Sequence, residues 1–114
     1  MEDLQITRNQ VLRGGGKQPR ALVEKRVLKF VQCHHGVPIY QMPAPWRYAV
    51  AFVLYYKEAL DVMDLVRLFQ RSKSTIDRYL ASGRFYMERH RKFQKYVQEL
   101  EEYLRTGWYR DICI

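Results

Sequence analysis

Apolar residues recur at a helical spacing in the first third of the chain. Between residues 19 and 32 they stand at i, i+4, i+7 and i+8, which places them on one side of a helix. This stripe consists of Val23, Val27, Phe30 and Val31. Pro19 suits the first turn of the helix, and Gly36 is expected to end it. Residues 37–43 are expected to be extended at best, because of their two prolines.

The pattern predicts two further helices in the middle of the chain. The first covers residues 46–59 and is apolar on nearly every side between residues 48 and 54. Such a helix lies either at the centre of a core or against a partner. The second covers residues 62–69, preceded by Asp61 with Asp64 at the spacing of a helix cap. Its apolar stripe consists of Val62, Leu65, Val66 and Phe69.

A last helical segment begins near Ser74 and continues to Leu104, with Gly107 as its stop. A set of mostly apolar residues recurs in it every three or four positions: Ile76, Tyr79, Gly83, Tyr86, His90, Phe93, Val97, Leu100 and Leu104. Gly83 either ends one helix and begins another, or allows close packing. The expected fold is therefore all-α, with a long or kinked C-terminal helix.

Short extended arms are expected at both ends of a single helical domain, residues 17–114. Residues 1–16 are predicted to form a strand-like or flexible N-terminal arm, in which three glycines at 14–16 act as a hinge. The tail, residues 108–114, is too apolar to remain in water.

Composition narrows the class of protein. A chain of 114 residues, 47% of them hydrophobic, fills one core and is neither disordered nor of low complexity. Two cysteines are too few for a disulfide-stapled miniprotein. The apolar run at residues 48–56 is too short to span a membrane, and the first residues lack a signal-peptide pattern. A soluble cytoplasmic protein is expected, in the host cytoplasm if the protein is viral.

Positive charge is concentrated in two regions. Twenty Lys and Arg against twelve Asp and Glu give a net charge of +8. Residues 67–95 hold nine basic and two acidic residues, and residues 8–29 hold seven basic residues and one acid. Such a field attracts polyanions, either nucleic acid or an anionic membrane surface, unless it is merely the solvated face of a basic protein.

Residues 60–83 read LDVMDLVRLFQRSKSTIDRYLASG, which is a short helix, a tight polar turn and a second helix that begins with hydroxyl residues. This segment resembles the helix-turn-helix of resolvases, transposases and small regulators of phages and archaeal viruses. Leu65 and Phe69 match the apolar anchors of the family's first helix, and Ser72 matches the cap of the second. The body of the second helix is matched by Ser74, Thr75, Ile76, Arg78, Tyr79 and Leu80.

Three positions depart from the family pattern. Val66 stands where Ala is usual, and Arg71 where an apolar residue is common. Gln70 replaces a glycine at a turn position that often needs a positive φ. The departure at Gln70 predicts an altered or loosened turn.

A helical wheel divides the second helix into two faces. Ile76, Tyr79, Leu80 and Gly83 cluster on one side, which is expected to pack on the first helix. Ser74, Arg78 and Ala81 fall opposite, with Thr75 and Ser82 at one flank. Small, hydroxylic and Arg side chains suit a helix in the major groove, although an ordinary exposed helix face is the alternative. The predicted DNA-binding residues are Arg71, Ser72, Lys73, Ser74, Thr75, Arg78 and Arg84.

Other chemistry has little support in the sequence. Cys33, His34 and His35 lack a second ligand pair at zinc spacing, so no metal site is predicted. Gln18 replaces the magnesium-binding residue of a phosphate loop after the triple glycine. No catalytic constellation is present, and no cofactor, small-molecule substrate or enzymatic activity is expected.

The sequence therefore predicts a protein that binds double-stranded DNA, a transcriptional regulator acting as a homodimer. The dimer interface is expected to include either the stripe of Phe93, Val97, Leu100 and Leu104 or the tail, unless that helix folds back onto residues 46–59. The alternatives are an architectural protein that binds nucleic acid without sequence choice, and a module that binds only protein.

Overall fold

The computed structural model describes residues 18–58 and 60–107. Its α-helices are α2 (Arg20–His35), α3 (Trp46–Phe52), α4 (Val62–Phe69), α5 (Lys73–Arg89) and α6 (Arg91–Thr106). A 3₁₀ turn, η2 (Ile39–Gln41), precedes α3, and a π-helical segment, η3 (Val53–Lys57), continues it. These residues contain no strand, which confirms the all-α prediction for the described part. None of the helices described is long and apolar enough to cross a membrane.

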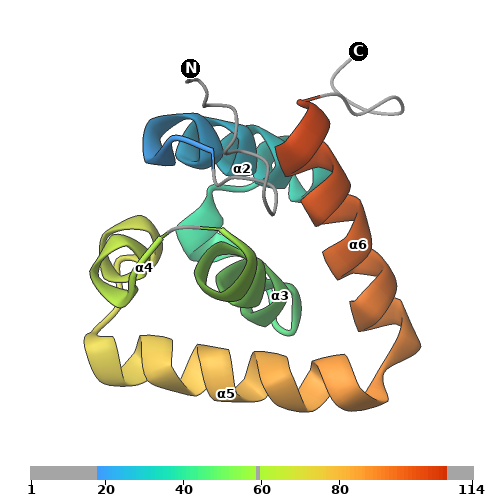
Figure 1. Cartoon of the computed structure of the whole chain (residues 1–114). Helices are drawn as coiled ribbons and strands as arrows, with labels where there is room; N and C mark the ends of the chain where they lie inside the picture. Colours follow the sequence, from blue (N-terminus) through green and yellow to red (C-terminus); the bar gives the residue numbers. More distant parts are fainter. Residues whose placement is uncertain (1–17, 59, 108–114) are drawn as a thin grey trace, which may run out of the picture.

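Helix α3 lies in the middle of the molecule, and α2, α4, α5 and α6 surround it (Figure 1). Residues 49–51 of α3 and 53–54 of η3 are completely buried. The residues that cover this segment come from the same chain, mainly from α5 and α6. Of the two alternatives for an all-round apolar helix, the central core position is the one observed.

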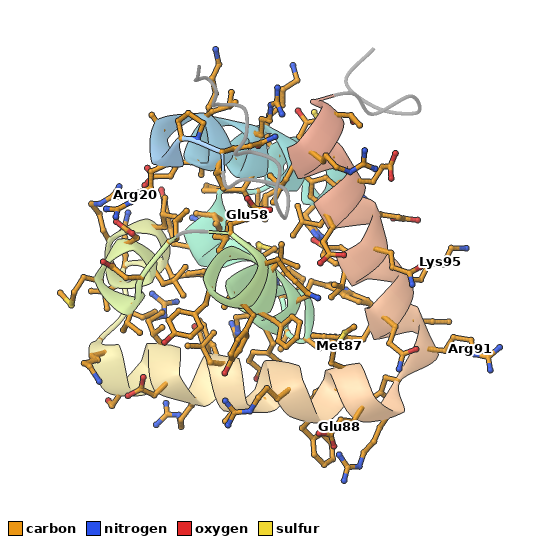
Figure 2. All side chains as sticks on the ribbon, viewed as in Figure 1. Arg20, Glu58, Met87, Glu88, Arg91 and Lys95 are labelled. Atoms are coloured by element: carbon orange, nitrogen blue, oxygen red, sulfur yellow. The ribbon has the colours of Figure 1, made fainter. Side chains whose placement is uncertain are left out.

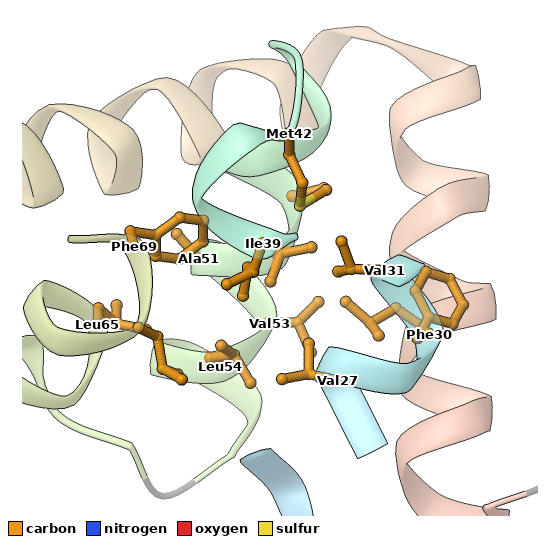
Figure 3. Packing of buried hydrophobic residues seen from close by; sticks show 14 of the residues in the cluster. Val27, Phe30, Val31, Ile39, Met42, Ala51, Val53, Leu54, Leu65 and Phe69 are labelled. Carbon is orange, nitrogen blue, oxygen red and sulfur yellow. The ribbon is translucent and has the colours of Figure 1, made fainter. Parts of the chain in front are cut away.

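The buried side chains form one continuous cluster (Figure 3). All four residues of the α2 stripe are fully buried, as predicted. In α4 the buried side is rotated from the predicted one, because Leu68 and Asp64 are buried beside Leu65 and Phe69, whereas Val62 and Val66 are only half-buried. The cap predicted for α4 is present as a capping box between Asp61 and Asp64.

The connection between α2 and α3 differs from the extended segment that was predicted. Gly36 ends α2 in the left-handed conformation, with φ 73°, as expected. Residues 39–41 then form a 3₁₀ turn, in which the Gln41 amide donates to the Pro38 carbonyl at 2.9 Å. Pro38 fixes φ at −64°, which suits entry into such a turn. The turn brings Ile39 and Met42 into the core.

The C-terminal segment is two helices that meet at a corner, so of the two predicted forms, long or kinked, the interrupted one is observed. The chain leaves helical geometry at His90, with φ −118° and ψ 114°, and α6 then runs in a new direction (Figure 1). The Gln94 side-chain amide donates to the Met87 carbonyl at 2.7 Å, which satisfies a carbonyl in the last turn of α5.

Gly83 lies inside α5 and permits close packing, the second of its two predicted roles. A Cβ atom there would be 3.0 Å from the Tyr48 carbonyl oxygen and 3.1 Å from the Phe52 Cβ. Helix α3 therefore crosses α5 with its backbone almost in contact.

The apolar stripe of α6 faces the interior of its own chain. Phe93, Val97, Leu100 and Leu104 are buried against α2, α3 and η3. Of the alternatives given for this stripe, the fold back onto residues 46–59 is therefore the one observed, because the central helix covers it. The N-terminal arm at residues 1–16 and the tail at 108–114 lie outside the described residues.

Candidate nucleic-acid interface

Helix α4 is fixed at its start by reciprocal hydrogen bonds. The Asp64 amide donates to Asp61 Oδ1 and the Asp61 amide donates to Asp64 Oδ2, each at 2.9 Å. The bond from the Asp64 amide is the main reason why the pKa of Asp61 is lowered from its usual value. Arg20 and Arg67 each approach Asp64 Oδ1 at 3.5 Å, so this end of α4 is also tied to α2.

The turn after α4 keeps a left-handed residue without glycine. Gln70 has φ 55° and ψ 47°, and its amide donates to the Val66 carbonyl. The Arg71 amide donates to the same carbonyl at 3.3 Å. The expectation of an altered turn is wrong at this position, because Gln70 adopts the conformation for which glycine is normally chosen.

Gln70→Gly is expected to raise the free energy of unfolding by about 0.5–1 kcal/mol. A left-handed residue with a Cβ costs about 1–2 kcal/mol, which exceeds the entropy that a glycine adds to the unfolded chain. Urea unfolding measures this change. Gln98→Gly is the matched control, since Gln98 is an exposed residue inside α6 and the substitution there should destabilise by a similar amount. Equal destabilisation by both variants would contradict the prediction.

Ser72 caps α5, as the sequence predicted. Its Oγ accepts the Thr75 amide at 3.3 Å and lies 3.2 Å from Ser74 Oγ. The Ser72 hydroxyl also lies 3.1 Å from Thr75 Oγ1. Three hydroxyls therefore gather at the first turn of α5, where unpaired amides carry partial positive charge.

The two faces of α5 are divided as the helical wheel predicts. Ile76, Tyr79, Leu80 and Gly83 are buried. Ser74, Arg78 and Ala81 are exposed, with Thr75 and Ser82 half-buried at the flank. The Tyr79 ring contacts Phe69 of α4 edge-on at 5.5 Å and Tyr48 of α3 at 5.6 Å. Packing against two helices thus holds α5 with its polar face outward.

The cations near the turn differ in how they are held. Lys73 Nζ lies 3.2 Å from Asp77 Oδ2, one turn further along the helix. The Arg71 guanidinium donates to the carbonyls of Gln70 at 3.1 Å and Tyr40 at 3.4 Å. Arg78 makes no hydrogen bond or ion pair within the described part of the chain, so its guanidinium is available to a ligand.

Arg84 stands apart from the other six predicted residues. It lies ten residues beyond Ser74, or about 15 Å along the helix axis. Its guanidinium donates to the hydroxyl of Tyr56 in η3. The structure therefore brings together Arg71, Ser72, Lys73, Ser74, Thr75 and Arg78, and separates Arg84 from them.

Two residues in contact with α5 or on it were not predicted from the sequence. The Arg47 guanidinium lies 5.5 Å from the Tyr79 ring centroid and 5.8 Å from that of Tyr48, and its buried Nε has no hydrogen-bond partner among the described residues. No sequence signal marks it, because the fold alone places it beside α5. Phe85 is 49% exposed, with the Arg89 guanidinium 4.1 Å from its ring centroid. Extending the wheel by one turn would have placed Phe85 in line with Arg78 and Ala81.

The described residues contain no group of three or more His, Cys, Asp or Glu that could hold a metal ion. Comparisons with protein-family models, curated proteins and solved structures gave no match. The function is therefore inferred from the geometry of α4, the turn and α5 alone.

Proposed function

We propose that this protein binds double-stranded DNA through α4 and α5 and acts as a transcriptional regulator. The observation that carries the proposal is the exposed face of α5. It presents Ser74, Arg78 and Ala81 to solvent directly beyond a turn whose cations, Arg71 and Lys73, are also exposed. Small side chains let a helix approach base edges closely, and an unpaired arginine binds guanine through two hydrogen bonds.

The proposed binding mode assigns separate tasks to the residues of this face. The first two turns of α5 lie in the major groove, where Arg78 contacts a base edge. Arg71, Lys73 and the hydroxyls of Ser74 and Thr75 contact backbone phosphates, which the positive end of the α5 dipole also favours. Arg84 lies too far along α5 to contact the same phosphates as Arg71 and Lys73. Arg84 could bind a phosphate only if the DNA also extended to η3.

The proposal includes a homodimer. In such a dimer, two recognition helices about 34–36 Å apart enter the major groove at successive turns on one face of the DNA. The α6 stripe is unavailable to such a dimer, and the tail at residues 112–114 lies outside the described residues. We expect light scattering across a hundredfold dilution to report twice the chain mass of 13.8 kDa. A folded species of 13.8 kDa at every concentration would contradict the dimer.

Arg78→Ala tests the DNA-binding mode. We expect it to weaken binding to a DNA selected from a random pool by about 1–3 kcal/mol, or about 5–150-fold. Arg91→Ala is the matched control, since Arg91 is an exposed arginine of α6 that points away from the molecule (Figure 2), and its loss removes the same charge. Affinities are measured by fluorescence anisotropy at one moderate salt concentration. If both variants bind the selected DNA as the parent does, α5 is not the recognition helix.

One observation favours an architectural protein without sequence choice as the second candidate. Exposed cations are not confined to α5, since Lys25 and Lys29 lie on α2 and Arg91, Lys92 and Lys95 lie on α6. In that case Arg78→Ala and Arg91→Ala should weaken binding to all sequences alike, and each should flatten the salt dependence by about one phosphate contact. A module that binds only protein, to which the exposed Phe85 is suited, would show no salt-dependent DNA affinity at all.

A further inference from the structure

An open pocket of about 450 Å³ lies where the C-terminus of α2, the start of α3 and the first half of α6 meet. Its aromatic side consists of His34, His35, Trp46 and Tyr96. Its charged side consists of Lys92, Lys95 and Glu99, all from α6. These residues belong to elements other than α4 and α5, so the pocket is separate from the proposed DNA-binding face. Its volume is in the range of small-molecule sites.

The aromatic side of the pocket is held in place by contacts behind it. The Trp46 ring stacks on Tyr96 with centroids 4.8 Å apart and planes 22° apart. The His34 ring stacks on Phe30 at 5.0 Å and 13°. The His35 Nε2 lies 2.7 Å from the Tyr96 hydroxyl oxygen. Because His34 is exposed and Trp46 and His35 are only half-buried, the pocket presents aromatic surface that is already ordered.

The charged side of the pocket has an excess of positive charge. Lys92 and Lys95 are three residues apart on one face of α6, so their like charges repel each other. Neither lysine forms an ion pair within the described residues, and Glu99, which lines the same pocket, is not within 4.0 Å of either amine. Burial, with the charge of His34 as a second cause, lowers the pKa of His35.

We propose that this pocket binds a nucleoside monophosphate, with its phosphate on Lys92 and Lys95 and its base against the aromatic surface of Trp46 and His34. Lysine ammonium groups bind phosphate as point charges, and a bound dianion relieves the repulsion between them. A nucleobase stacks on aromatic rings, whereas inorganic phosphate leaves the aromatic side of the pocket unused. The proposal concerns a different surface from the DNA-binding face and does not rest on it.

Isothermal titration of the full chain with adenosine 5′-monophosphate tests the proposal. We expect saturable binding, with adenosine and ribose 5-phosphate each at least tenfold weaker, because each lacks one of the two contacts. In a Trp108→Phe background, where Trp46 is the remaining tryptophan, the nucleotide should quench the fluorescence and ribose 5-phosphate should not. Equal affinity for the nucleotide and ribose 5-phosphate would overturn the role of the aromatic side.

The double variant Lys92→Gln/Lys95→Gln tests the phosphate contact. It should weaken nucleotide binding at least tenfold while the circular dichroism spectrum and unfolding midpoint stay close to those of the parent, because both lysines are exposed. Lys25→Gln/Lys29→Gln removes the same charge from exposed positions of α2 and should bind the nucleotide as the parent does. Parent-like binding in the first variant, equal losses in both, or no binding to the parent would overturn the proposal. DNA affinity, measured alongside, reports separately on the α5 face.

Discussion

Ile76→Ala is expected to lower the free energy of unfolding by about 2–5 kcal/mol. Ile76 is fully buried on the inner face of α5. Removing three carbons there leaves a cavity against α3 and α4, which both pack on α5 and cannot close the space without shifting the helix. Urea unfolding measures the loss of free energy, and an m-value equal to that of the parent protein shows that the transition is still two-state.

Arg78→Ala provides the control on the same helix. Arg78 is exposed and makes no hydrogen bond or ion pair within the described part of the chain, so its loss should change the free energy of unfolding by less than about 0.5 kcal/mol. The two variants should therefore separate stability from DNA affinity, with Ile76→Ala altering the first and Arg78→Ala the second. A stable Ile76→Ala protein would show that α5 is not packed with this face inward.

Phe30→Ala is expected to destabilise the protein by about 3–5 kcal/mol. The Phe30 ring is fully buried, and it contacts Tyr96 edge-on at 5.6 Å and Tyr103 at 5.7 Å. These contacts hold α2 against α6, and they include aromatic interactions beyond the buried area. Thermal and urea unfolding measure the change.

Leu28→Ala is the control for Phe30→Ala, because Leu28 lies on the outer side of the same helix and is 42% exposed. Leu28→Ala should change the free energy of unfolding by less than about 0.5 kcal/mol. Since His34 stacks on Phe30, the Phe30→Ala protein should also lose affinity for the nucleotide if it remains folded. Similar stability in both variants would contradict the packing of α2 on α6.

The limits of several helices follow from local signals that the sequence carries. Gly36 and Gly107 end α2 and α6 with φ of 73° and 74°, a conformation that glycine adopts without a steric cost. Asp61 and Ser72 accept amide hydrogens at the starts of α4 and α5. These interactions span at most four residues, so spacing along the chain is enough to predict them.

The division of α5 into a buried and an exposed face was also determined by the sequence. A rigid helix turns about 100° per residue, so the position of Ile76 fixes that of Arg78 once one side is packed. Six of the seven predicted DNA-binding residues therefore gather at one end of α5. Arg84 is the exception, because it lies ten residues beyond Ser74, and only the fold places it beside Tyr56, which is 28 residues earlier in the chain.

Only the tertiary structure decided how the helices meet. The three- and four-residue spacing continues through His90 without a break, because α5 and α6 both turn their apolar sides toward the same central helix. Periodicity records which side of a helix is apolar and carries no information about a change of axis direction. The corner at His90, the burial of the α6 stripe within its own chain and the pocket beside Trp46 all arise from contacts between residues far apart in sequence. Such contacts depend on packing, which no local pattern encodes.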